Sequence, residues 1–180
     1  FLCGGEGDVG IWRIQVGGGR FDARTLVDWV HEFGQPYEGT FDPEEEEYVC
    51  DVDESARSFG SDVLFADAEG LTIYRLQGAR GYLVASSQGS STFLVYDLTS
   101  TRLRGTFAID DAATDAVGES DGAMVMGVPL GPTFSQGLLV VHDGDDEPNE
   151  DATNFKFVRW QDVASPLGLT IDTTNGDPRR

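Results

Sequence analysis

The chain has 180 residues, and 32 acidic against 12 basic side chains give it a formal net charge of −20 at pH 7. A field of this sign repels nucleic acid and anionic membranes and attracts multivalent cations, so we expect neither nucleic acid nor a membrane as a partner. No apolar run in the sequence approaches the roughly 20 residues of a membrane-spanning helix. The chain begins inside a strand-like run at Phe1, and we interpret it as part of a longer protein.

The first third of the chain predicts strands and one acidic loop. Residues 10–16 alternate between two faces, Gly17 to Gly19 form a turn, and residues 24–30 are a further strand candidate. Residues 34–62 contain two prolines and a run of four glutamates. We expect this segment to be a long, solvated acidic loop inserted between strands.

The rest of the chain predicts more strands and no helix. Four strand-like runs separated by short turns predict an antiparallel meander, the unit from which β-propellers are built. Three further strands follow, and we expect the polar tail of residues 165–180 to fray. The expected strands are residues 71–76, 81–87, 92–98, 103–109, 123–128, 137–142 and 155–160.

The cysteines and histidines define little chemistry. Cys3 and Cys50 could form one disulfide, but two cysteines cannot form a Cys-rich metal site. His31 and His142 make no recognisable zinc motif.

Asp67 and Glu69 open the first run of the meander. Residues two apart in a strand point to the same face, so the two charges repel unless a cation lies between them or one takes a proton. Oxygen-only ligands favour a hard cation, Ca²⁺ before Mg²⁺. A solvated acidic turn is the alternative. Acidic segments recur near later strands, and loops at one end of a propeller channel could bring them together: Asp115, Glu119 and Asp121, then Asp143, Asp145 and Asp146.

Two motifs carry a family resemblance. Asp67-Ala68-Glu69-Gly70-Leu71 and Ala85-Ser86-Ser87-Gln88-Gly89, at this spacing, resemble the β-propeller phytases. The resemblance implies an all-β, six-bladed propeller, of which residues 1–164 would be the C-terminal part, about three blades, followed by the tail. It also implies hydrolysis of phytate, the hexakisphosphate of inositol, with several Ca²⁺ ions bound. We expect a secreted protein that is a monomer when complete.

The resemblance also implies roles for individual residues. Asp67, Glu69 and Asp115 would be catalytic through the metals they hold, and a metal-bridged water would attack phosphorus. Where the family has two adjacent acidic residues before its Gly-Ile-Trp run, this chain has Glu6-Gly7-Asp8, so Glu6 or Asp8 would substitute. Gln88 could touch substrate or metal, or could be a turn amide. The expected calcium ligands are Asp67, Glu69, Asp115, Asp121, Asp143, Asp145, Asp146 and Glu6.

Two other functions fit the sequence. One is a non-catalytic calcium-binding propeller domain, and the other is a different calcium-dependent propeller hydrolase such as an esterase or lactonase. The phosphate-holding lysines and arginines of the family belong largely to its N-terminal half. The sole lysine of this chain is Lys156.

Overall fold

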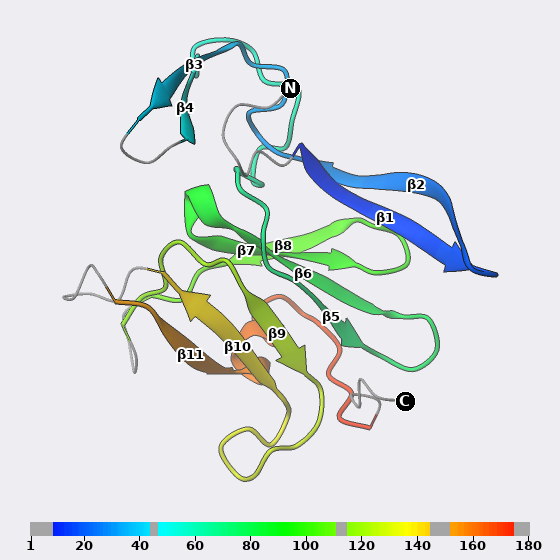
Figure 1. Cartoon of the computed structure of the whole chain (residues 1–180). Coiled ribbons are helices and arrows are strands. Elements are labelled where there is room, and N and C mark those ends of the chain that lie inside the picture. Colours follow the sequence, from blue (N-terminus) through cyan, green and yellow to red (C-terminus); the bar gives the residue numbers. More distant parts are fainter. Residues whose placement is uncertain (1–8, 44–46, 111–114, 145–151, 175–180) are drawn as a thin grey trace. The chain divides into compact units, whose positions relative to one another are not determined.

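A computed structural model describes residues 9–43, 47–110, 115–144 and 152–174 (Figure 1). Within these ranges it is built from antiparallel strands and one short helix, which confirms the all-β prediction. The chain divides into two compact units, residues 1–68 and 69–180, which are described separately. Over the described residues the helix is too short to cross a membrane.

The first unit opens with a long hairpin. Strand β1 (Gly10–Gly17) pairs with β2 (Arg20–Trp29) across the expected turn, where Gly18 and Gly19 both have positive φ. The apolar residues of the outer half of β1 are exposed, whereas Ile11 near its start is buried.

A second hairpin replaces part of the expected acidic loop. Strand β3 (Tyr37–Asp42) pairs in register with β4 (Glu47–Val52), so that Tyr37 lies opposite Val52 and Phe41 opposite Tyr48. The expectation of a loop throughout residues 34–62 is therefore wrong for these two segments. Most of the glutamate run, residues 44–46, lies outside the described residues, as does Cys3 of the possible disulfide.

The second unit contains the predicted meander. Its strands pair in the order β5 (Leu71–Arg75), β6 (Gly81–Ser87), β7 (Thr92–Asp97) and β8 (Leu103–Phe107). A single 3₁₀ turn, η1 (Gln88–Ser90), joins β6 to β7. Val84, Phe93 and Val95 are fully buried in these central strands. Strands β6 and β7 are buried on both faces, as is typical of short, continuous apolar runs bounded by turn residues.

Three further strands form a second sheet in the order β11–β10–β9. They are β9 (Ala123–Met126), β10 (Leu138–Asp143) and β11 (Asn154–Arg159). Val125, Leu139 and Val141 from this sheet share one core with Tyr74 and Val84 of the meander. Both sheets have the consecutive antiparallel connections of propeller blades.

Trp160 begins a helix rather than ending a strand. The helix α1 (Trp160–Ala164) follows β11 directly, and its Trp160 is fully buried and stacks on Tyr74 with ring centroids 4.7 Å apart. The expectation of no helix is therefore wrong here. Five residues are too few to show a helical period in the sequence, so packing of the indole decides the conformation.

The described part of the C-terminal tail is ordered against the core, contrary to the expected fraying. Leu169 is buried, and the backbone N–H of Thr170 donates to the Tyr82 hydroxyl at 3.0 Å. The Tyr74 hydroxyl accepts from the Asp172 N–H at 2.8 Å and donates to the Asp172 carbonyl at 3.0 Å. Two tyrosine hydroxyls thus anchor a segment that is polar in sequence.

Candidate metal and phosphate site

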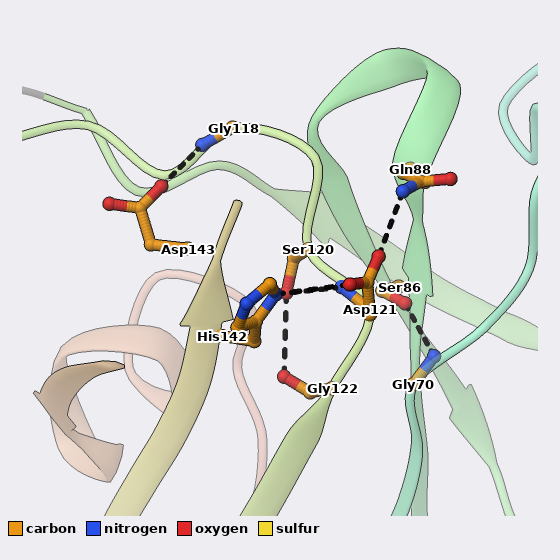
Figure 2. A network of polar contacts seen from close by, with 9 residues as sticks. All are labelled: Gly70, Ser86, Gln88, Gly118, Ser120, Asp121, Gly122, His142 and Asp143. Carbon is orange, nitrogen blue, oxygen red and sulfur yellow. Dashed lines mark hydrogen bonds and ion pairs between the residues drawn. The ribbon is translucent and has the colours of Figure 1, made fainter. Parts of the chain in front are cut away.

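Gly70 lies where the two family motifs meet the acidic segment that leads to Gly122. Its N–H donates to the Ser86 hydroxyl at 2.6 Å, and the Ser86 N–H donates to the Gly70 carbonyl at 2.8 Å (Figure 2). A Cβ on Gly70 would lie 2.9 Å from the Ala123 nitrogen and 3.0 Å from the Gly122 carbonyl carbon, so only glycine allows this close approach. Glu69 and Asp121 each directly precede one of these touching glycines.

The Asp121 carboxylate is held from two sides (Figure 2). The Gln88 amide donates to Oδ1 at 2.8 Å, and His142 Nδ1 lies 3.3 Å from Oδ2. The same His142 nitrogen lies 3.5 Å from the Asp121 N–H, so neutral imidazole accepts there while protonated imidazole donates to the carboxylate. Asp121 remains half exposed, at 50%. Its charge is therefore oriented but open to solvent.

Asp143, at the end of β10, lies in the interior. Its carboxylate is fully buried, Oδ1 accepts from the Gly118 N–H at 3.0 Å, and Oδ2 lies 2.8 Å from the Lys156 ammonium. Both oxygens of this predicted calcium ligand are thus engaged within the protein. A buried carboxylate requires such partners because its desolvation is costly.

Lys156, in β11, also contacts Asp115. Its ammonium lies 2.7 Å from Asp115 Oδ2, and its side chain is only 6% exposed. Burial lowers the pKa of Lys156, but hydrogen bonds and charge interactions with Asp115 and Asp143 outweigh that effect, so the pKa lies above its ordinary value. The amine therefore stays charged at neutral pH and neutralises part of the acidic surroundings.

The remaining predicted site residues divide into two groups. Asp67 and Glu69 are half-buried in the irregular segment immediately before β5, not within the strand where their alternation placed them. Glu6, Asp145 and Asp146 lie outside the described residues. In the second unit, Glu69 lies just before β5, Gln88 directly follows β6, and Asp143 ends β10. Asp115 and Asp121 lie in the segment between β8 and β9.

The side-chain oxygen atoms present are of the type that binds a hard cation. Carboxylates and an amide are the oxygen ligands that Ca²⁺ takes. Within the residues that the structure describes, however, no three acidic, histidine or cysteine side chains come together closely enough to define a metal centre. Asp143 does not fit as a ligand, because the Gly118 amide and Lys156 use its oxygens. Glu69, Asp115 and Asp121 remain the carboxylates of the second unit that could hold calcium, and Asp67 belongs to the first unit.

The fold and the site together define a class. The chain has antiparallel sheets with the consecutive strand connections of propeller blades. The family model for "Phytase" matches residues 38–180. The chain therefore belongs to the phytase family, and the β-propeller phytase resemblance is confirmed.

A curated relative gives the same assignment. The chain is 40% identical to the "3-phytase" of Bacillus subtilis (strain 168) over 115 residues, which are 62% of this chain and 30% of the relative. The chain thus spans about a third of that relative's length. The family match begins at residue 38 and so includes much of the segment expected to be an insertion.

Sequence reasoning missed two residues of this site. No zinc motif indicates His142, and Lys156 stands out in the sequence only as the sole lysine. One signal could have indicated Lys156. A lone lysine in the middle of an apolar strand, flanked by Phe155 and Phe157, points inward when its neighbours point outward, and it is buried while both phenylalanines are exposed.

Proposed function

We propose that the protein carrying this chain hydrolyses phytate to lower inositol phosphates and inorganic phosphate, in a reaction that depends on calcium. Membership of the phytase family is the observation that carries this proposal. The similarity to a 3-phytase supports the same reaction class, that of a phosphoric monoester hydrolase. The acidic strand-end residues support the calcium requirement, because carboxylates alone would repel a polyanionic substrate.

The proposal gives the described residues separate tasks. Asp67, Glu69, Asp115 and Asp121 would hold calcium, with Glu6, Asp145 and Asp146 completing the set. Bound calcium would offset the charge of carboxylates and phosphates and lower the pKa of a coordinated water, supplying the nucleophile.

Gln88 orients a carboxylate in this scheme. Its amide donates to Asp121 Oδ1, which fixes one rotamer of a half-exposed side chain. His142 Nδ1 lies 3.3 Å from the other oxygen. A ligand held in this way loses less conformational entropy when it binds a metal.

The proposal is tested by phosphate release from calcium phytate with the full-length protein in ¹⁸O-labelled water. We expect Asp67→Ala and Glu69→Ala to lower the rate by at least about tenfold, since each removes a proposed ligand. Asp162→Ala is the matched control, because it removes a surface carboxylate that pairs with Arg159. Undiminished activity in both site variants would overturn the assignment.

The same experiment separates the alternatives. Calcium binding without phosphate release would indicate a non-catalytic calcium-binding domain. Hydrolysis of a carboxylester in preference to phytate would indicate a propeller hydrolase of another kind. Incorporation of one ¹⁸O atom into the released phosphate is the expected result for direct attack by water.

A further inference from the structure

Lys156 joins two separate parts of the acidic region. Its ammonium lies between Asp115, at the start of the segment that leads to Asp121, and Asp143, at the end of β10. The two carboxylates come from different segments, 28 residues apart in sequence. A single buried cation within hydrogen-bond distance of both fixes their separation.

Backbone contacts complete the same connection. The Gly118 N–H donates to Asp143 Oδ1 at 3.0 Å, and the Gly144 N–H donates to the Gly118 carbonyl at 3.0 Å. A Cβ on Gly144 would lie 2.6 Å from the Glu119 carbonyl oxygen, so the two segments touch closely. The 115–121 segment is therefore attached to β10 and β11 at a position just before Asp121.

We propose that Lys156 is a positioning residue, an internal cation that fixes Asp115 and the 115–121 segment so that Asp115 and Asp121 can bind calcium. This inference rests on the proposed function. Asp143 then serves as the buried counter-ion of Lys156 instead of binding metal. Its complete burial and its two engaged oxygens are the observations that favour this role.

Charge balance gives Lys156 a second consequence. Asp115, Asp121 and Asp143 together carry three negative charges, and like charges at short range repel one another. The Lys156 ammonium offsets the charge of the fully buried Asp143 and also contacts one oxygen of Asp115, while Asp121 lies outside this pairing.

The test compares four variants of the full-length protein by calcium titration calorimetry and by calcium-dependent phosphate release. Lys156→Met alone leaves Asp143 buried without its cation and could prevent folding. The double variant Lys156→Met with Asp143→Asn removes both charges, and its amide oxygen still accepts from Gly118. Arg159→Met is the matched control, because it removes an exposed cation from the same strand.

We expect the double variant to fold, to bind calcium about tenfold or more weakly and to need correspondingly more calcium for half-maximal activity, as is typical of residues that orient metal ligands. Lys156→Arg keeps the positive charge and should retain most of the calcium affinity of the unaltered protein. Arg159→Met should leave the calcium affinity unchanged. A folded double variant with unaltered calcium affinity would overturn the inference alone. Absence of calcium binding by the unaltered protein would overturn the proposed function as well.

Discussion

Gly70 and Ser86 form a reciprocal pair of hydrogen bonds, one from each backbone N–H, that fastens the segment before β5 to the end of β6. The pair unites the two motifs that identify the family. It also places the backbone of Gly70 against Gly122, directly after Asp121. The site is therefore built on a backbone contact that tolerates no side chain.

Gly70→Ala tests this contact. The added methyl would lie within 3.0 Å of backbone atoms, and overpacking of this kind costs about 1–3 kcal/mol. We expect that loss in the free energy of unfolding, measured by urea denaturation, together with weaker calcium binding. Gly122→Ala is the control, because its methyl would meet only the His142 Cβ at 3.7 Å. Equal stability of both variants would contradict the packing argument.

Gln88→Leu tests the clamp on Asp121. The leucine keeps the approximate volume but removes the amide that donates to Asp121 Oδ1. We expect calcium affinity to fall by about tenfold, as for other losses of a hydrogen bond to a metal ligand. The melting temperature without calcium should change little, since the contact is exposed. Calorimetric titration that gives the same affinity for both proteins would show that the clamp is irrelevant.

Calcium should stabilise the folded protein. A ligand that binds only the native state raises the free energy of unfolding by about 2.7 kcal/mol at a hundred times its Kd. We expect millimolar Ca²⁺ to raise the melting temperature, measured by differential scanning fluorimetry, and EDTA to reverse the rise. Mg²⁺ at the same concentration serves as the control for a general effect of ionic strength. A melting temperature that does not change when calcium is added would argue against a calcium site.

Tyr74→Phe should release the C-terminal segment. The hydroxyl makes two hydrogen bonds to the backbone of Asp172, and their loss leaves a donor and an acceptor unsatisfied, at a cost of about 1–3 kcal/mol. We expect faster proteolysis beyond residue 165, detected by mass spectrometry. Tyr82→Phe, which removes one hydrogen bond to Thr170, should have a smaller effect. A tail that resists proteolysis equally in all three proteins would refute this anchoring.

The turn after β7 gives the protein a sensitivity to acid. Hydrogen bonds from the backbone and hydroxyl of Ser100 hold the pKa of Asp97 below its ordinary value of 3.8. Because the folded state lowers this pKa, the carboxylate stabilises the fold above pH 3.8 and the contribution disappears as the pH falls through the lowered pKa. We expect Asp97→Asn to reduce stability at pH 6 but much less near pH 2, compared by urea denaturation. An equal loss at both pH values would exclude ionisation as the cause.

Local sequence patterns predict the strands of the second unit. They fail for segments whose conformation depends on contacts with residues far away in the sequence. Residues 71–107 predict the meander because short apolar runs rich in β-branched and aromatic residues alternate with turn residues. Residues 165–174 look like a fraying tail, yet tyrosines about 90 residues earlier in the chain anchor them. For the site, Asp121 was predicted from its acidic segment. Its contact with Gln88 and the pairing of Lys156 with Asp143 depend on the register of two sheets, which no local pattern encodes.

Phe155 and Phe157 are 63% and 58% exposed on β11, the edge strand of its sheet. Unpaired edges with apolar side chains promote association between molecules, while a net charge of −20 opposes it by mutual repulsion. That repulsion vanishes near the isoelectric point of about 4.1. Charge repulsion therefore has to outweigh this apolar attraction, and light scattering should rise steeply as the pH approaches that value.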